Sequence, residues 1–430
     1  MLAELRQYVV TDPWPFVIDL EKCEGMYLAT VDGQRVFDWA GGYASKWIAH
    51  NHPRLQEPDY LRRLTNAANH KLANPDFLTP ECLAYYRILH QLAPRCMPRE
   101  GLEIYTVNSG AEAVENMMKY FINLHDSKDS GKKGPRRFLY FDQAFHGRTI
   151  FALNITEITH DPVITRDFHG LVSGNIQIPF PAVNTDESAA ENHFRTVEAL
   201  DRVRRALSDF KDEIVAIIVE PLQGAGGHRV AEPAFFQGLS QLAHDFGVFL
   251  GFDEVQTAGG QTGAFFMTDL LDLPHPPHAI AAAKKLGNGV LYMRKSMTDE
   301  GVLDSTWGGN LADMVRFCQE WDIVQSEGLA GQVPGKAAYL VRAMQQLQSA
   351  HPDKIRNIRG YGLYQGFDLA SPSQKAQLIE TSLQQDHLLL LGAGRNSIRL
   401  RPHLHVSREN IDELFRILMN QVGKLQPVSG

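Results

Sequence analysis

The chain has 430 residues, more than one compact core normally supports, so we expect two domains. Hydrophobic residues make up 44% and charged residues 21%, the composition of an ordinary globular enzyme, and the net charge of −8 argues against a surface that binds nucleic-acid phosphates. No apolar run approaches the roughly 20 residues of a membrane helix, and the first residues lack the apolar core of a signal peptide, so we expect neither feature.

The cysteines and histidines give no sign of a metal site or a disulfide framework. The four cysteines are scattered without a C-x-x-C pair, which favours a reducing, cytoplasmic location: Cys23, Cys82, Cys96 and Cys318. Three histidine pairs have no acidic residue at ligand spacing, so we expect no metal and interpret them as solvated or structural: His50 with His52, His275 with His278, and His403 with His405.

The two ends of the chain contain strand and helix signals that differ from those of the middle. Between Tyr27 and Asp38, two segments of alternating polarity flank Asp32-Gly33, which predicts a β-hairpin. A long helical pattern begins near Asn310, and short strand-like runs follow near residues 366–368 and 397–400. We therefore predict a small α+β domain made from residues 1–69 and 316–430.

The middle of the chain alternates short apolar runs with helical patterns. Residues 233–246 predict a helix with one apolar face, Pro233 in its first turn and Gly247 at its end. The flanking runs, 215–219 and 248–252, are continuous apolar stretches of strand length. Strands of this kind joined by helices indicate an α/β domain with a mostly parallel sheet covered by helices, which we place at residues 70–315.

The most informative feature is an acid and a lysine that follow two such strands. Asp253 comes directly after the run 248–252, and Lys284 follows the apolar residues 279–283. At the mouths of neighbouring strands, the acid can hold a proton on the pyridine nitrogen of pyridoxal phosphate, and the lysine can form the Schiff base that is exchanged for a substrate amine. Each residue alone is also common as a cap or a solvated charge, so the inference rests on their order and spacing.

Three further segments offer groups of the same kind. Residues 108–113 place a serine and a glycine where a helix begins, which suits an anion but equally an ordinary N-cap. In the next segment, Phe145 can stack on a planar cofactor or fill the core, and Arg148 can bind a carboxylate or form a surface ion pair. The small-residue loop 305–310 can contact phosphate or be only a tight turn.

Together these segments resemble the class III, fold type I aminotransferases that use pyridoxal phosphate. The resemblance runs from about residue 42 to 407 in family order and is carried by residues 108–116, 145–148, 253–257 and 305–311. Within the family, the chain looks most similar to the lysine ε-aminotransferases and next to the 4-aminobutyrate aminotransferases. The resemblance implies an α/β fold with a large, mostly parallel sheet domain and a smaller α+β domain, and a homodimer with shared active sites.

The resemblance also implies a role for individual residues. Lys284 matches the Schiff-base lysine, with the adjacent Lys285 as its rival, and Asp253 matches the partner of the pyridinium nitrogen. The other implied cofactor contacts are the phosphate-binding turn Ser109, Gly110 and Ala111, the ring-stacking Phe145, Gln256 near the phenolic oxygen, and Thr306, which reaches the phosphate of the neighbouring subunit. Arg148 is implied to hold the distal carboxylate of an amino donor, and Arg399 the α-carboxylate of the keto-acid acceptor, 2-oxoglutarate.

Two positions depart from the family pattern. The family's E-P-x-Q-G-E-G-G occupies residues 220–227, with Ala225 in place of the second glutamate. The resemblance implies that this glutamate covers the arginine at position 399 when an ω-amine binds and moves away for 2-oxoglutarate. Because Ala225 cannot neutralise Arg399, we expect easier binding of α-carboxylates or a different gate. Asp304 replaces an asparagine, and Glu220 either joins the pocket or only ends its strand.

The sequence leaves the exact activity open. The leading interpretation is transfer of the terminal amino group of L-lysine, or of a similar ω-amino acid, to 2-oxoglutarate, giving the semialdehyde and glutamate. Donors such as 4-aminobutyrate or an α-amino acid are the first alternative. A pyridoxal-phosphate isomerase or decarboxylase would turn over a donor without any keto acid. A non-catalytic cofactor-binding protein is suggested by Ala225 but weakened by the retention of Lys284 and Asp253.

Overall fold

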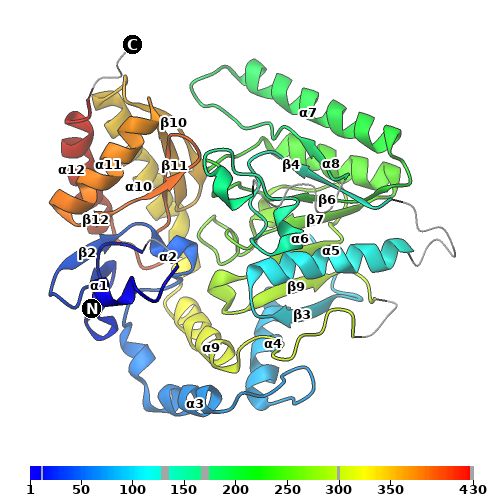
Figure 1. The fold of residues 1–430 in the computed structure, drawn as a ribbon, viewed down its shortest axis with the longest axis horizontal. Coiled ribbons are helices and arrows are strands. Elements are labelled where there is room, and N and C mark those ends of the chain that lie inside the picture. The colour runs from blue at the N-terminus through cyan, green and yellow to red at the C-terminus, as the bar shows by residue number, and fades with distance from the viewer. Residues whose placement is uncertain (11–12, 127–134, 166–173, 298–300, 427–430) are drawn as a thin grey trace.

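A computed structural model describes residues 1–10, 13–126, 135–165, 174–297 and 301–426. Figure 1 shows two lobes: the middle of the chain forms one, and the N-terminal and C-terminal segments gather in the other. The helices are α1 (Leu2–Leu5), α2 (Gly41–Ala44), α3 (Pro58–Asn69), α4 (Pro80–Leu92), α5 (Gly110–Asp126), α6 (Ile150–Leu153), α7 (Ala189–Asp209), α8 (Pro233–Phe246), α9 (Leu311–Ser326), α10 (Leu329–Ala350), α11 (Pro372–Asp386) and α12 (Arg408–Gly423).

The central lobe is built on a seven-stranded sheet in the order β3-β9-β8-β7-β6-β4-β5. Every pairing between neighbours from β8 to β5 is parallel, whereas β9 is antiparallel to both of its neighbours. The strands are β3 (Glu103–Val107), β4 (Arg137–Phe141), β5 (Ile176–Ile178), β6 (Ile214–Val219), β7 (Phe249–Asp253), β8 (Ala279–Ala282) and β9 (Gly289–Met293). The predicted α/β domain with a mostly parallel sheet is confirmed.

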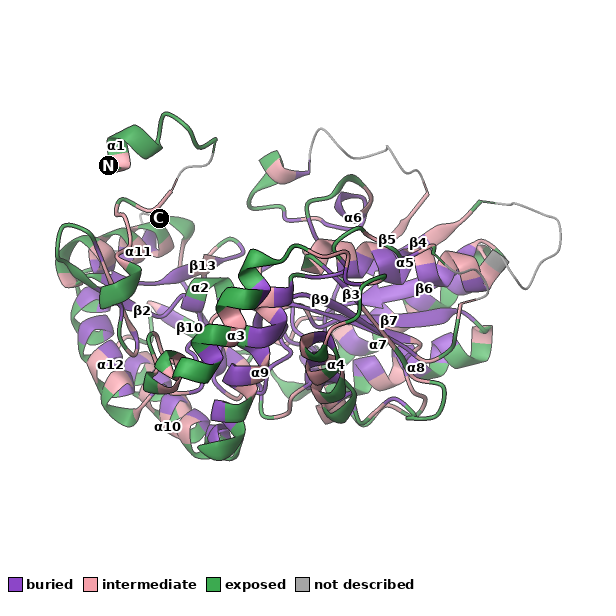
Figure 2. Ribbon diagram, turned by 90° about the horizontal axis from the view of Figure 1, so that it is seen from below, coloured by how far each residue is buried: buried purple, intermediate pink, exposed green. Residues whose placement is uncertain are grey.

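Helices cover both faces of this sheet, which explains its continuous apolar strands. Successive residues of β7 enter different cores: Phe249 packs with α5 residues such as Phe121, and Leu250 belongs to the core that contains Phe235 of α8. Figure 2 shows the strands buried between helices whose outer faces are exposed. Because neighbouring side chains of a strand point to opposite faces, burial on both sides requires apolar residues at every position.

The second lobe joins the two ends of the chain through a small sheet. The predicted hairpin is confirmed as β1 (Tyr27–Ala29) and β2 (Arg35–Asp38), and β12 (Leu388–Leu389) pairs in parallel with β2. A separate antiparallel sheet has the order β10-β11-β14-β13, with β10 (Ile355–Tyr361), β11 (Tyr364–Leu369), β13 (Leu391–Ala393) and β14 (Ser397–Leu400). We propose that this lobe corresponds to residues 1–69 and 316–430, and the other to residues 70–315.

The helix predicted at residues 233–246 is present with the same bounds. Pro233 occupies its first turn, and Gly247 ends it in the left-handed conformation with φ of 66°. The following strand begins at Phe249 rather than Val248, because the Val248 N–H donates to the Ala243 carbonyl at 3.0 Å and closes the helix. No helix within the described ranges has the length and apolar character to cross a membrane.

The close approach of α5 to the sheet at Gly251 gives a test of the packing. A Cβ at Gly251 would lie 2.7 Å from Met117 Sδ and 2.8 Å from Phe121 Cε2, so Gly251→Ala should lower the free energy of unfolding by about 1–3 kcal/mol. Gly335 in α10 has open space around the same position, so Gly335→Ala should raise stability by about 0.5–1 kcal/mol. Denaturant unfolding measures both changes, and an equal change in the free energy of unfolding of the two variants would contradict the close packing at Gly251.

Candidate active site

The candidate site lies at the edge of the large sheet where the parallel strands end. Glu220 follows β6, Asp253 ends β7, and Lys284 follows β8 after a single residue. Since β6, β7 and β8 run parallel, their carboxyl ends meet at one edge. This is where open α/β sheets bind their ligands, because the loops that follow the strands face a common space.

The two adjacent lysines have different surroundings. Lys284 is half-buried, and its Nζ donates to the Tyr43 carbonyl at 2.7 Å. Lys285 is buried, and its Nζ contacts the carbonyl of Gln256 at 2.7 Å and the hydroxyl of Tyr364 at 2.9 Å. Lys285 is therefore enclosed by partners, and Lys284 is the amine beside the acids of the sheet edge.

Burial, together with the positive charges of Arg399 and Arg401, lowers the pKa of Lys284 to about 7, although Asp253 and Glu220 oppose the change. An ordinary lysine has a pKa near 10.4 and is almost entirely protonated at neutral pH. The Lys284 amine is therefore about half neutral at pH 7, which is the form that attacks a carbonyl. Its backbone is left-handed, with φ of 56°, a strained conformation for a non-glycine residue.

The acceptor for Lys284 comes from an unusual turn in the N-terminal segment. Residues 41–44, labelled α2, all have positive φ between 54° and 70°, so they form a left-handed turn. A Cβ at Gly41 would lie 2.0 Å from the Arg401 carbonyl oxygen, so this turn needs glycine there. The backbone N–H groups of Ala40 and Gly41 donate to Asp38 Oδ1, which holds the turn in place.

Asp253 is held by a buried histidine that the sequence motif contained but to which no role had been assigned. Its Oδ2 lies 2.8 Å from His146 Nδ1, and its Oδ1 accepts the Val255 N–H at 3.0 Å. Burial lowers the pKa of His146, but the adjacent Asp253 carboxylate outweighs it, so that the pKa is raised overall. A carboxylate fixed in this way can hold a proton on a ring nitrogen that faces it.

Glu220, whose place the sequence left open, belongs to the site. Its carboxylate accepts the Phe145 N–H at 2.9 Å, so it positions the aromatic ring. Burial raises its pKa to about 7. Arg148 lies at the surface with its guanidinium 5.4 Å from the Phe145 ring centroid, so it is available to a carboxylate that approaches from solvent.

The phosphate-binding turn predicted at residues 109–111 lies at the start of α5. The Ser109 hydroxyl accepts the Glu112 N–H at 3.2 Å, so its oxygen serves as the N-cap that the alternative interpretation proposed. A Cβ at Gly110 would meet Val255 at 2.6 Å, so only glycine allows this close approach to the loop after Asp253. The helix begins with free backbone N–H groups beside the strand end, an arrangement suited to an anion.

Thr306 lies on an exposed loop whose backbone is held by buried side chains. Asn74 donates to the carbonyls of Trp307 and Gly309 at 2.9 and 2.6 Å, and Thr106 donates to the carbonyl of Gly308 at 2.7 Å. The side chains of Thr306 and Trp307 remain exposed, so this loop presents a hydroxyl and an aromatic ring outward. Just before this loop, Asp304 accepts the Tyr105 hydroxyl at 2.6 Å.

Arg399 is a buried cation without a full set of partners. It lies in β14, opposite Gly366 and Leu391, and its Nε has no hydrogen-bond acceptor in the described part of the chain. Burial lowers its pKa to about 10, opposed by Tyr43 and Glu220. Ala225 offers no charge, and its carbonyl is bonded to the Gly394 N–H at 3.0 Å. A ligand carboxylate would satisfy this arginine.

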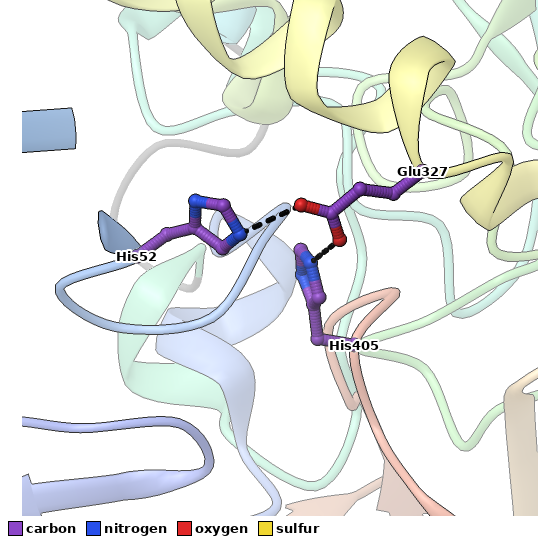
Figure 3. Close-up of side chains that lie close together, drawn as sticks. All are labelled: His52, Glu327 and His405. Carbon is purple, nitrogen blue, oxygen red and sulfur yellow. Dashed lines mark hydrogen bonds and ion pairs between the residues drawn. The ribbon is translucent and has the colours of Figure 1, made fainter. Parts of the chain in front are cut away.

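A separate cluster joins two histidines of different pairs through an acid that sequence spacing could not supply. Glu327, the first residue after α9, joins the two rings: His52 Nε2 lies 2.9 Å from its Oε1, and His405 Nε2 lies 2.9 Å from its Oε2 (Figure 3). Burial alone would raise the pKa of Glu327, but contacts with the two rings lower it overall. In the sequence, each of these histidines is paired with another histidine two positions away, whereas the fold joins histidines from opposite ends of the chain through Glu327.

The hydrogen bonds of this cluster indicate a structural link between distant segments rather than a metal site. The backbone N–H groups of Arg54 and Ala49 donate to Nδ1 of His52 and His405, at 3.3 and 3.2 Å, which leaves the ring proton on Nε2. If a metal bound Nε2, the ring proton would have to be on Nδ1. There it would face a backbone N–H donor, whereas a metal-ligating histidine normally donates this proton to an acceptor. The expected absence of a metal stays a prediction.

The comparisons with known proteins agree with this geometry. The sequence profile of the family described as "Aminotransferase class-III" matches residues 9–422. The chain belongs to the class III aminotransferases. It is 31% identical to the L-lysine-epsilon aminotransferase of Mycobacterium tuberculosis (strain ATCC 25618 / H37Rv) over 95% of this chain and 92% of that protein, and 29% identical to the acetylornithine aminotransferase of Gloeobacter violaceus over 98% and 97%.

The solved structures support the same placement. The lysine aminotransferase from M. tuberculosis in its internal aldimine form has a TM-score of 0.91 to this chain at 28% identity, covering 99% of this chain and 98% of the other. The fold is therefore the fold type I architecture of the pyridoxal-phosphate aminotransferases. Members of class III use pyridoxal phosphate, and the residues here fit it: a near-neutral lysine, the buried acid Asp253 and a glycine cradle at Gly110.

The contrast between the two lysines gives a direct test. Incubation with pyridoxal phosphate and reduction with borohydride should label Lys284 in the wild type and in Lys285→Ala, and nothing at this site in Lys284→Ala. The labelling rate should increase as the pH rises through about 7, because the neutral amine then accumulates. Peptide mass spectrometry locates the adduct, and an adduct on Lys285 in the wild type would contradict the assignment.

Proposed function

We propose that this aminotransferase moves the terminal amino group of L-lysine, or of a similar ω-amino acid, to 2-oxoglutarate, giving the semialdehyde and glutamate. The observation that carries the proposal is the near-neutral Lys284 amine, which lies within the electrostatic influence of the acids Asp253 and Glu220 and of the cation Arg399. Such a site can exchange amines and hold a substrate carboxylate at once. The similarity to proteins named L-lysine-epsilon aminotransferase supports lysine as the donor.

Pyridoxal phosphate, when bound, supplies an aldehyde that condenses with amines and a ring that draws electrons from the bond being broken. Lys284 would hold its aldehyde carbon and Asp253, supported by His146, its ring nitrogen, with Phe145 against the ring. Ser109, Gly110 and Ala111 would bind its phosphate, and Gln256 its phenolic oxygen. With a pKa of about 7, the Lys284 Nζ can take a proton from a substrate carbon and return it.

The two arginines would divide the carboxylates of the substrates. Arg399, buried with an unsatisfied Nε, would bind the α-carboxylate of the keto acid, and the exposed Arg148 the distal carboxylate of the amino donor. A guanidinium binds a carboxylate through two parallel hydrogen bonds, which fixes the orientation of the substrate as well as its charge. The reacting carbon would then be held near Lys284.

We propose a cytoplasmic homodimer with shared active sites. Thr306 would contact the cofactor phosphate held by the other subunit, which is in keeping with its exposure on an anchored loop beside Trp307, 43% exposed. Phe77 and Leu78, which closely follow the loop's anchor Asn74 in the sequence, are also large exposed apolar side chains. Exposed apolar surface of this kind marks protein interfaces.

A second candidate, an α-amino acid or another ω-amine as donor, is favoured by Ala225. With no carboxylate on that loop, Arg399 would remain open to the α-carboxylate of any donor, including ω-amino acids that bear one. The chain is also 27% identical to a probable mitochondrial 4-aminobutyrate aminotransferase of Caenorhabditis elegans. Donor preference therefore depends on whether Arg399 binds the α-carboxylate of the donor during the first half reaction.

The donor is tested by one half reaction at a time. Protein loaded with pyridoxal phosphate should lose its cofactor absorbance band on addition of L-lysine and regain it with 2-oxoglutarate, with glutamate released in equal amount. 4-Aminobutyrate, ornithine and alanine should act more slowly. No change with any ω-amine, together with a change with alanine, would contradict the lysine proposal and favour α-amino donors.

The role of Ala225 is tested by restoring the family's carboxylate. Ala225→Glu should raise the rate with 4-aminobutyrate relative to alanine by about tenfold. When the donor has no α-carboxylate, the new glutamate would pair with Arg399 and offset about 1.4 kcal/mol of the cost of leaving its guanidinium unpaired. Ala225→Gln has the same length without the charge and should leave the ratio near that of the wild type. Unchanged ratios in the glutamate variant would contradict the proposed open arginine.

A further inference from the structure

Behind the candidate site lies a second buried arginine without an acidic partner. Arg401 is fully buried, and within the described residues its hydrogen-bond partners are the side chains of Gln256 and His228 and the carbonyl of Leu400. Its guanidinium also lies 4.6 Å from the ring centroid of Tyr364. A buried cation held only by neutral groups is costly, so an arginine retained in this place requires an explanation beyond packing.

Arg401 fixes the orientation of the Gln256 amide. Its Nε and Nη2 both donate to Gln256 Oε1, at 3.0 and 2.9 Å. Gly224 also lies so close that an added Cβ there would be 2.0 Å from Oε1 and 2.6 Å from Nε2. The amide oxygen is therefore occupied and the amide plane is confined. The Nε2H₂ group has no acceptor in the described part of the chain, so its protons remain for a ligand.

His228 holds Arg401 in turn. The Arg401 Nη2 group donates to His228 Nδ1 at 2.8 Å, which requires that this nitrogen carry no proton. The ring lies against Gly366, where an added Cβ would be 2.5 Å from its Cδ2, and the His228 carbonyl accepts from Arg359 Nε at 2.8 Å. His228 is thus packed against the neighbouring strands β10 and β11, and its Nδ1 accepts from Arg401.

The charge state of His228 agrees with this geometry. Burial lowers its pKa well below the ordinary value, and the charges of Arg401, Arg359 and Arg399 lower it further. The imidazole therefore stays neutral across the physiological range and keeps Nδ1 as an acceptor. A residue at position 228 without an acceptor would leave an Arg401 donor unsatisfied in the interior.

We propose that His228 and Arg401 are positioning residues that act through Gln256, holding its amide oxygen so that the Nε2H₂ group donates to the phenolic oxygen of bound pyridoxal phosphate. The inference rests on the proposed function, because it needs the cofactor to be attached at Lys284. A donor at the phenolic oxygen stabilises negative charge there, and this weakens the hold on the proton of the nitrogen that joins the cofactor to Lys284. The pH at which the bound cofactor changes its absorbance therefore reports on the amide.

The experiment is a double-mutant cycle on this titration midpoint. Gln256→Ala should raise the midpoint by about one pH unit, the size expected for loss of one charge-assisted hydrogen bond. His228→Phe, which removes the acceptor for Arg401, should raise it by about half a unit. In the Gln256→Ala background, His228→Phe should add nothing, because the amide through which it acts is gone.

Two further variants separate positioning from simple support of the fold. His228→Asn retains an acceptor near the place of Nδ1, and asparagine tolerates the left-handed φ of 52° at this residue, so the wild-type midpoint should return. Arg401→Lys keeps the charge but loses the forked contact with Gln256 Oε1, so its midpoint should move toward that of Gln256→Ala. Lys284 still faces the charges of Arg399, Asp253 and Glu220 in every variant, so these do not alter the comparison.

The outcomes are distinct. Additive shifts in the double variant, or an unchanged midpoint in both His228→Phe and Arg401→Lys beside a shifted Gln256→Ala, would overturn the inference while leaving the proposed function intact. Failure of wild-type protein to form any band with pyridoxal phosphate that disappears in Lys284→Ala would overturn both. Should His228→Phe fail to fold, the Arg401→Lys and His228→Asn pair decides the matter by the same measurement.

Discussion

Four cationic side chains packed together at one end of the sheet set the chemistry of this protein. Lys284, Lys285, Arg399 and Arg401 are contributed by two distant segments, and burial lowers the pKa of each, to about 7 for Lys284, 10 for Arg399 and 9 for Arg401. Each positive charge also makes it harder for a neighbouring group to hold a proton. Among these groups the Lys284 amine loses its proton near neutral pH, because a lysine pKa falls readily on burial whereas an arginine stays protonated. The same excess of positive charge favours the binding of a substrate carboxylate.

The acids that influence Lys284 are kept in place by neutral or histidine partners. Asp253 is fixed by His146, and Glu220 is tied to the backbone of the loop that carries Phe145. The Lys284 amine therefore lies in the field of both the arginines and the acids. Such preorganised charges stabilise charge that develops during a reaction without moving the protein.

The departure at Ala225 can be understood within this arrangement. The loop from Gly224 to His228 packs its backbone against Gln256 and Gly394 and is held by Arg359 through the carbonyls of Gly227 and His228. A loop anchored at this many points is suited to supporting neighbouring side chains rather than to swinging a charge in and out. The other departure, Asp304, has a local role as the acceptor of the Tyr105 hydroxyl.

The sequence by itself determined the class of fold and the main chemical groups. Continuous apolar runs predicted buried parallel strands, and the spacing of Asp253 and Lys284 after two of them indicated the cofactor, because both features depend on order along the chain. What only the tertiary structure decided are contacts between distant segments: His146 with Asp253, Arg401 with Gln256 and His228, and Glu327 between His52 and His405. No local pattern encodes such contacts, since each joins residues that are far apart in the sequence and that only the folding of the chain brings together.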